Sequence, residues 1–430
     1  MQSNLPKEYL KSVLEQLGEA DYLDYLESFN IKPSRWARCV SGKVTPDWFN
    51  GIASEIPRGL KVNLDPAWQA GTYYCQERSA MLPIDEFIAK FAQDKKFSCI
   101  LDVCASPGGK SIQLMELLTP DGFLISNEII NSRCKVLMEN LERTSAWKSS
   151  VTSLDIEKIG DKCPEAFDLI LVDAPCSGEG MFRKDPDTIK QWSKDAIDLC
   201  VRRQIRILKN SLRCLSPGGY LIYSTCTLNV LENESVIEHI LEIENLELVE
   251  SVKIWPQKGL GEGHYYAFIR KLGAVNFSNF KPSKKKKNRI PDSLDELLSS
   301  IHKLSWMKSQ GELIDHNDKW YWCSDRLPNL KYRRKGLELG EFRRGFKKSE
   351  FKFSQALALS LEDKDLDKSS IRSIELTDDL AKKYMRGEEL QNVKDFKGYN
   401  LICYNGQGLG WVKANGSRLR NLFPQAWRIN

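Results

Sequence analysis

The feature that most constrains this sequence is a strand-like segment that runs directly into a glycine turn, within residues 98–111. The apolar run at 99–103 is too short for a helix and predicts a fully buried strand. The Pro-Gly-Gly sequence at 107–109 predicts a tight turn, and the apolar spacing over 110–118 predicts a helix. Glycines let a backbone approach a ligand and helix amides offer donors. The turn is therefore a predicted site for a nucleotide-like ligand.

Several ligands are compatible with such a turn. A P-loop needs a glycine ahead of Gly109-Lys110-Ser111, at the place of Cys104 or Ala105, and neither residue is glycine. The G-x-G-x-x-G pattern of a dinucleotide site is also absent. A structural turn without a ligand is disfavoured because the strand end is so rich in glycine. The remaining candidate ligand is S-adenosylmethionine. The residues at the ends of the later strands indicate whether it fits.

The composition is that of an ordinary globular chain with room for two or three domains, since 41% of its 430 residues are hydrophobic. No apolar run is long enough to cross a membrane and the first residues lack a signal-peptide core, so we expect a cytoplasmic protein. The 12 cysteines never form C-x-x-C and there are only 4 histidines, so we expect no metal site. A net charge of +5 does not by itself indicate nucleic acid.

Strand and helix patterns alternate from residue 99 to residue 271, which predicts an α/β fold with a mostly parallel sheet and helices on both faces. After the first strand, the patterns predict strands at 122–128, 151–154, 167–173 and 219–225, with a long amphipathic helix at 197–215. Segments 245–254 and 265–271 are expected to close the sheet as an antiparallel pair.

Three of these strands end in a carboxylate, at Glu128, Asp155 and Asp173. Ligands of open α/β sheets lie outside the carboxyl ends of the strands. The first carboxylate is placed to accept from ribose hydroxyls, the second from an adenine amino group, and the third lies near the reacting methyl group. A single acid at a strand end is more often a helix cap. Three in series after a glycine turn indicate a methyl-donor site and a Rossmann-like S-adenosylmethionine-dependent methyltransferase sheet.

Two cysteines follow strand ends as well, Cys176 after 167–173 and Cys226 after 219–225. These strands are expected to be neighbours, so both thiols can line one pocket. Carbon 5 of a pyrimidine is a poor nucleophile, and a thiolate that adds at carbon 6 makes it reactive toward a sulfonium methyl group. A base must then remove the carbon 5 proton. Buried structural thiols are the alternative, but the surroundings are polar and rich in glycine.

Three stretches carry a family resemblance: Asp-Val-Cys-Ala-Ser-Pro-Gly-Gly-Lys at 102–110, Asp-Ala-Pro-Cys-Ser-Gly-Glu-Gly at 173–180 and Ser-Thr-Cys-Thr at 224–227. They resemble the RNA cytosine-5 methyltransferases of the NOL/NOP/Sun (RsmB/NOP) group. The resemblance covers most of residues 71–271, and the paired Pro-Cys and Thr-Cys motifs are highly specific to that group.

The resemblance implies roles for individual residues. In that family the thiol of the Thr-Cys motif, here Cys226, is the nucleophile, and the thiol of the Pro-Cys motif, here Cys176, assists breakdown of the adduct. Asp173 would hydrogen-bond cytosine at its ring nitrogen. The residues implied to hold S-adenosylmethionine are Cys104, Ala105, Ser106, Pro107, Gly108, Gly109, Lys110, Glu128, Asp155 and Asp173. DNA cytosine-5 enzymes attack with the Pro-Cys thiol instead, so spacing alone leaves the nucleophile open.

Other domains are expected on either side of the catalytic domain, which we place at 76–272. Residues 1–75 predict a small, mostly helical domain whose aromatic and basic side chains either contact RNA or form a solvated face over a core. Residues 273–291 predict a basic linker suited to phosphate. In the C-terminal domain at 292–430, the stretch 398–424 contains an Asn-Gly hairpin signature and resembles the PUA-like domain of the rRNA methyltransferase F branch.

The sequence therefore predicts a monomeric, metal-free enzyme that methylates carbon 5 of a cytidine in 16S rRNA, within the small ribosomal subunit, after extruding the base into its pocket. The same chemistry on tRNA is an alternative, because the motifs do not encode the RNA. A non-catalytic RNA-binding assembly factor is another, although a pure binder needs neither thiol. A third, a DNA cytosine-5 enzyme, would be inactivated by loss of Cys176.

Overall fold

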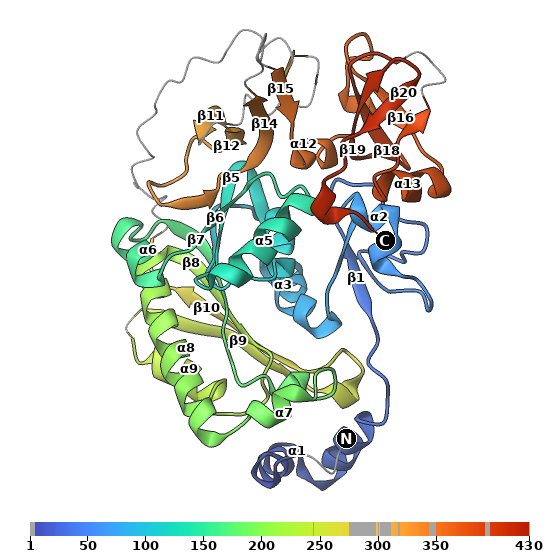
Figure 1. The fold of residues 1–430 in the computed structure, drawn as a ribbon. Helices are drawn as coiled ribbons and strands as arrows, with labels where there is room; N and C mark the ends of the chain where they lie inside the picture. The colour runs from blue at the N-terminus through green and yellow to red at the C-terminus, as the bar shows by residue number, and fades with distance from the viewer. Residues whose placement is uncertain are drawn as a thin grey trace.

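The computed structural model describes residues 5–243, 245–274, 298–299, 301, 311–316, 319–343, 350–391 and 396–429. Residues 275–291 of the predicted basic linker lie outside this set. The described residues form four β-sheets, with an eight-stranded sheet at the centre (Figure 1). Among the helices of these residues, none has the length and apolar character needed to cross a membrane.

The central sheet has the strand order β13-β6-β5-β4-β7-β8-β10-β9. Its strands are β4 (Phe97–Asp102), β5 (Leu118–Asn127), β6 (Ser149–Thr152), β7 (Phe167–Asp173), β8 (Leu215–Thr225), β9 (Leu246–Ile254), β10 (His264–Lys271) and β13 (Tyr332–Arg334). Strands β4 to β8 pair in parallel, and β10 pairs antiparallel with both β8 and β9. The predicted parallel sheet and its antiparallel closing pair are therefore confirmed.

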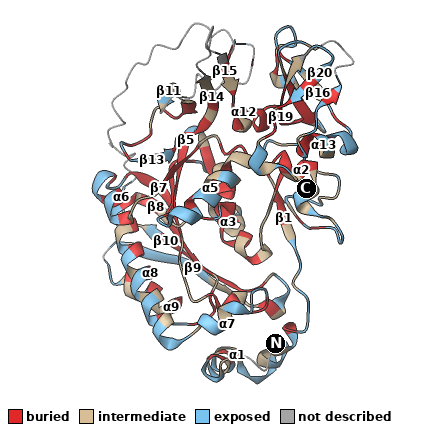
Figure 2. Cartoon of the chain, viewed as in Figure 1, coloured by how far each residue is buried: buried red, intermediate tan, exposed pale blue. Residues whose placement is uncertain are grey.

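Helices cover both faces of this sheet (Figure 1). On one face lie α3 (Arg78–Phe91), α4 (Gly109–Leu114) and α5 (Asn131–Arg143), and on the other α6 (Ile156–Lys162), α8 (Lys194–Cys214) and α9 (Glu234–Leu241). Consecutive residues of one strand point to opposite faces of the sheet. In β4, for example, Ile100 and Leu101 belong to two different hydrophobic clusters. The central strands β4 and β7 are buried on both faces (Figure 2) and are nearly continuous apolar runs, whereas the edge strand β9 is largely exposed and alternates polar with apolar residues.

The N-terminal segment contains the expected helix and, in its later part, a small sheet that was not expected. Helix α1 (Lys7–Ser28), interrupted at Gly18, packs against Phe182 and Trp192 of the catalytic domain. The later part instead forms an antiparallel sheet of β1 (Trp36–Cys39), β2 (Ala53–Glu55) and β3 (Tyr73–Cys75). Here the apolar segments are short and separated by glycine turns, so they bury more surface as paired strands than as one-sided helices.

The C-terminal region contains two further sheets. The first has β11 (Glu312–His316), β12 (Lys319–Cys323), β14 (Leu337–Arg343) and β15 (Glu350–Phe353), followed by α12 (Gln355–Leu359). The second has β16 (Arg372–Glu375), β17 (Leu390–Gln391), β18 (Tyr399–Tyr404), β19 (Gln407–Asn415) and β20 (Arg418–Asn421), with α13 (Asp378–Met385). Asn405 and Gly406 both have positive φ angles, 50° and 77°, which confirms the predicted hairpin between β18 and β19.

Strand β13 crosses the expected domain boundary. It comes from the C-terminal region but pairs antiparallel with β6, and Tyr332 packs against the core of the central sheet. The division of the chain at 272 stays a prediction, and the central sheet itself extends past it.

Candidate active site

The glycine turn lies between β4 and α4, as predicted. Gly108 caps α4 with a φ of +119°, which a side chain would strain. A Cβ on Gly109 would lie 2.9 Å from the side chains of Tyr74 and Gln76, so glycine lets β3 and the turn approach each other. The loop is fastened to α5, where Arg133 donates to the carbonyl of Ser106 at 2.9 Å.

Asp102 ends β4 beneath this loop and is fully buried. Ser111 Oγ donates to its Oδ2 at 2.6 Å, while Oδ1 has no hydrogen-bond partner. Burial raises the pKa of Asp102 to about 7, and the nearby charge of Asp173 adds to the effect. A buried carboxyl with one free oxygen at the cofactor loop is a candidate ligand contact that strand-end reasoning did not single out.

Asp173 ends β7, the next strand across the sheet. Its Oδ2 lies 2.9 Å from Lys110 Nζ, and its Oδ1 accepts from Ser224 Oγ of β8 at 2.7 Å. Burial opposes the charge of this carboxylate, but Lys110 and the hydrogen bond from Ser224 hold the pKa of Asp173 below its ordinary value. Asp173 is therefore an ionised acceptor, and Lys110 connects it to the glycine turn.

The two predicted cysteines meet. Cys176 Sγ lies 3.3 Å from Cys226 Sγ, although 50 residues separate them in the chain. The hydrogen bond with Cys226, followed by burial, raises the pKa of the Cys176 thiol well above its ordinary value. Cys176 is thus held as a protonated thiol beside the sulfur of Cys226.

A buried polar network, which the sequence analysis missed, holds the two cysteine loops together. Glu232 is fully buried and accepts from Ser177 N at 3.0 Å, Gln204 Nε2 at 2.8 Å and Asn229 Nδ2 at 2.8 Å. Ser177 Oγ also lies 2.8 Å from Thr227 Oγ1. The polar residues beside each Cys motif were the only signal in the sequence for this network.

The site is a cavity of about 510 Å³ at the edge where β4, β7 and β8 end. The sequence-predicted residues that line it are Cys104, Ala105, Ser106, Pro107, Gly109, Lys110, Asp173, Cys176 and Cys226. The structure therefore brings the cofactor loop and both thiols into one space. Among the residues that the structure describes, no cluster of His, Cys, Asp or Glu could hold a metal ion.

Glu128 and Asp155 lie outside the residues that line this cavity. Glu128 is buried, accepts from Ile130 N at 2.9 Å and lies 3.5 Å from Arg133. Asp155 caps α6 by accepting from Glu157 N at 3.0 Å and pairs with Arg206 at 3.1 Å. Each carboxylate therefore has a structural partner already, and its cofactor role stays a prediction.

His264 is a further lining residue that the sequence analysis did not identify. It starts β10, is 2% exposed, and its Nε2 lies 3.9 Å from Asp173 Oδ1 without a hydrogen-bond partner. Because β10 runs antiparallel, its first residue lies at the edge where β7 and β8 end. A strand-end pattern marks only the last residues of parallel strands, so the first residue of an antiparallel strand carries no such signal in the sequence.

The strand order, the antiparallel β10 and a cavity at the carboxyl edge define a Rossmann-like methyltransferase fold. Solved structures agree with this class. A methyltransferase homolog from Pyrococcus horikoshii is 25% identical, with a TM-score of 0.51, and covers 62% of this chain and 100% of its own. NSun6 from Pyrococcus horikoshii with SFG is 18% identical, with a TM-score of 0.53, and covers 64% of this chain and 100% of its own.

Sequence comparisons define the family more narrowly. The family described as 16S rRNA methyltransferase RsmB/F matches residues 90–274, and the methyltransferase RsmF PUA domain matches residues 371–429. Ribosomal RNA small subunit methyltransferase F from Aeromonas salmonicida is 33% identical over 387 residues, covering 83% of this chain and 79% of the relative. The protein of the same name from Vibrio vulnificus is 30% identical over 430 residues, covering 93% of this chain and 86% of the relative. This chain belongs to the RsmB/F family of RNA methyltransferases and carries the family's C-terminal PUA domain.

Proposed function

We propose that this protein methylates carbon 5 of a cytidine in 16S rRNA, through a covalent adduct between Cys226 and the base. The observation that carries the proposal is the pair of thiols, 3.3 Å apart, in the same cavity as Asp173 and the glycine turn. A methyltransferase that attacks a more nucleophilic atom needs no thiol. Two thiols at adjacent strand ends suit a base that must first be activated at carbon 6.

S-adenosylmethionine would supply the methyl group. The cavity fits it, because the turn at 104–110 offers a glycine-rich wall and Asp102 presents an unpartnered buried oxygen. Tyr74 of β3 and Gln76, which follows it, line the cavity beside the turn. We propose Glu128 and Asp155 as further contacts, on the strength of the family resemblance alone.

The chemistry of the protein side chains follows from their positions. Cys226 Sγ bonds to carbon 6 of the cytosine, which makes carbon 5 electron-rich. Asp173, ionised and fixed by Lys110 and Ser224, accepts a hydrogen bond from the polar edge of the base. Once carbon 5 carries the methyl group, solvent water takes the carbon 5 proton, the C–H electron pair forms the C5–C6 double bond, and the bond from carbon 6 to Cys226 Sγ breaks. Cys176, a thiol that lies against Cys226, is placed to donate a proton to the departing sulfur and so assist release.

The RNA substrate is proposed from the relatives, which are named as small-subunit rRNA methyltransferases, and from the PUA domain match. Folded RNA is recognised largely through phosphate contacts and shape, and a base that undergoes chemistry is turned out of its stack. The N-terminal sheet and the PUA domain lie beside the catalytic domain and would contact such an RNA. A monomeric enzyme located in the cytoplasm is part of the same proposal.

The test is transfer of labelled methyl groups from S-adenosylmethionine to 16S rRNA, small ribosomal subunits and bulk tRNA. We expect label in 5-methylcytidine of the ribosomal substrate with the wild type, none with Cys226→Ala, and a protein–RNA adduct with Cys176→Ala. Cys39→Ala, a half-buried cysteine outside the cavity, is the matched control and should retain activity.

Other outcomes would contradict the proposal in separable ways. Label confined to tRNA would overturn the RNA substrate and leave the chemistry standing. Activity that survives Cys226→Ala and disappears with Cys176→Ala would reverse the roles of the two thiols. No transfer to any RNA by a protein that binds S-adenosylmethionine would favour the RNA-binding assembly factor.

A further inference from the structure

His264 is held at the centre of the site by two glycines. Gly263 precedes it with a φ of +122°, and a Cβ on Gly180 would lie 2.5 Å from the carbonyl oxygen of Gly263. Gly180 N also donates to the carbonyl of Cys226 at 2.9 Å. The start of β10 is therefore packed against the loops that carry both cysteines, and His264 has no freedom to move away from them.

The imidazole of His264 is neutral. Burial lowers the pKa of His264 to about 3, and the charge of Lys110 acts in the same direction. A neutral imidazole offers one N–H donor and one acceptor. A buried polar atom that lacks a partner costs stability, and such atoms are commonly kept for a ligand. Nε2 is such an atom, and His264 is one of the residues that line the cavity, beside Asp173.

His264 Nε2 and Asp173 Oδ1 form a pair whose polarity matches cytosine. The carboxylate only accepts, and in the tautomer that carries its proton on Nε2 the imidazole supplies a donor 3.9 Å away. The amino group of cytosine donates and its ring nitrogen accepts, side by side on one edge, whereas uracil presents the reverse order. Asp173 by itself, ionised, has no proton to offer the ring nitrogen.

We propose that His264 is a base-contacting residue that donates from Nε2 to the ring nitrogen of the target cytosine while Asp173 accepts from its amino group. This inference rests on the proposed function and adds to it a residue and a basis for choosing cytosine over uracil. It also moves Asp173 from the ring nitrogen, its position by family resemblance, to the amino group.

The test compares His264→Phe, which keeps a ring without polar atoms, with His264→Gln, which keeps an amide donor. The substrate is unmodified 16S rRNA, and the readouts are kcat and KM for methyl transfer and the dissociation constant for S-adenosylmethionine. We expect His264→Phe to lower kcat/KM by about 10- to 100-fold, the equivalent of one or two hydrogen bonds, with cofactor affinity unchanged. His264→Gln should recover part of the loss. His239→Gln, on α9 away from the cavity, is the matched control.

Two results would overturn the inference while the proposed function stands: His264→Phe with wild-type kinetics, or cofactor affinity falling in parallel with kcat/KM, which indicates a structural role. A kcat/KM of His264→Gln no higher than that of His264→Phe would also count against a hydrogen bond to the base. A wild type that labels no RNA would overturn the proposed function and this inference together.

Discussion

At the residue scale, the site holds two carboxyls whose pKa values are shifted in opposite directions. Asp173 lies against Lys110 and Ser224, and the pKa of its carboxyl is below the ordinary value. Asp102 is buried with a single hydroxyl partner, and its pKa is raised to about 7. The difference comes from the neighbours, because both residues end adjacent strands of one sheet.

This difference predicts a pH dependence of stability. A carboxyl in the unfolded chain titrates near pH 4, whereas Asp102 titrates near 7 in the folded protein. Between these values the folded state binds the extra proton, so the contribution of Asp102 to the free energy of unfolding falls as pH rises, by at most about 1.4 kcal/mol per pH unit. The lowered pKa of His264 makes the free energy of unfolding rise with pH below pH 6.5, which is the opposite trend. The contribution of Asp102 is therefore obtained from the difference in stability between the wild type and a variant that lacks this carboxyl.

The measurement is urea unfolding of the wild type and Asp102→Asn at pH 5, 6, 7 and 8. We expect the stability of the wild type relative to Asp102→Asn to decrease from pH 5 to pH 7 and to level off above. Asp94→Asn, at an exposed position, is the control. A difference between wild type and Asp102→Asn that stays constant with pH would show that Asp102 is not shifted.

At the element scale, three strand ends and two loops make the site. Strands β7 and β8 deliver Asp173 and Cys226, while β10 enters the same edge from the opposite direction with His264. The segments directly after β7 and β8, residues 174–178 and 226–233, contain no helix or strand. Glu232 fixes them by accepting from both, so the distance between the thiols depends on a carboxylate that lines no part of the cavity.

We therefore predict that Glu232→Gln loosens the two loops. An amide offers one acceptor oxygen where Glu232 offers two, so a buried donor among Ser177, Gln204 and Asn229 loses its partner. The expected cost is about 1–3 kcal/mol in the free energy of unfolding. Methyl transfer should fall at the same time, because the thiols of Cys176 and Cys226 are no longer held 3.3 Å apart. Glu238→Gln, at an exposed position of α9, is the control, and equal effects of the two changes would refute the role of Glu232.

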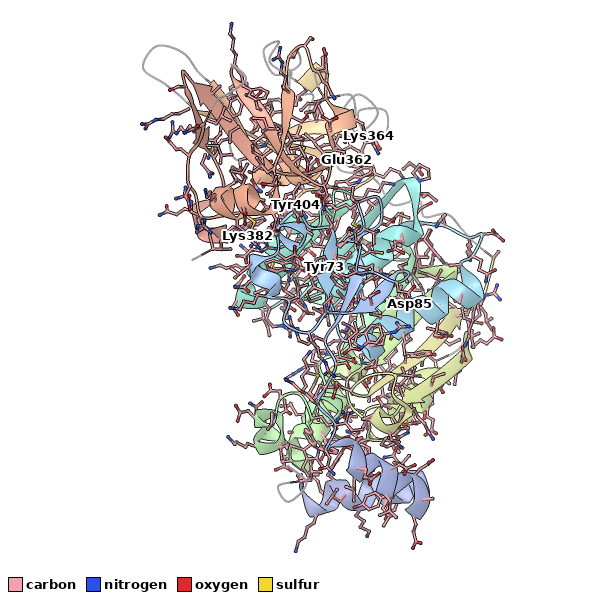
Figure 3. All side chains as sticks on the ribbon, turned by 90° about the vertical axis from the view of Figure 1, so that its right-hand side faces the viewer. Tyr73, Asp85, Glu362, Lys364, Lys382 and Tyr404 are labelled. Carbon is pink, nitrogen blue, oxygen red and sulfur yellow. The ribbon has the colours of Figure 1, made fainter. Side chains whose placement is uncertain are left out.

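At the scale of the whole molecule, the N-terminal sheet lies between the catalytic domain and the PUA domain (Figure 1). Figure 3 labels Tyr73 of β3 and Tyr404 of β18 at this boundary, and Tyr404 packs on the cluster that contains Tyr73. Arg143, at the end of α5, stacks between Trp68 at 4.0 Å and Trp427 at 4.4 Å. One guanidinium thus connects all three parts of the chain.

The corresponding prediction is that Arg143→Ala weakens the junction. It removes two cation–π contacts, each worth about 0.5–2 kcal/mol, and the hydrogen bond to Gln69 Oε1. We expect a loss of about 1–4 kcal/mol in the free energy of unfolding and faster proteolysis at the C-terminal end. Arg143→Lys should recover little, because a lysine does not stack between two rings. Arg203→Ala, at an exposed position of α8, is the control. A junction of unchanged stability would show that Arg143 contributes nothing.

Much of the central fold followed from the sequence, because a strand buried on both faces is a continuous apolar run and each run ends at a visible turn. The glycine turn, the parallel strands, the antiparallel closing pair and the β18–β19 hairpin were all predicted in this way. The N-terminal sheet and β13 were not. Their strands are three or four residues long, and only their partners from distant parts of the chain decide that they pair.

For the site, the sequence by itself indicated Asp173, Cys176 and Cys226 as candidates and determined that they reach one edge, since parallel strands end together. The tertiary structure decided what surrounds them. It placed Lys110 on Asp173, assigned Asp155 to a helix cap with Arg206 and brought His264 in on an antiparallel strand. A pattern along the chain records the end of each strand, but a charge or hydrogen bond between side chains exists only when distant strands are neighbours in space.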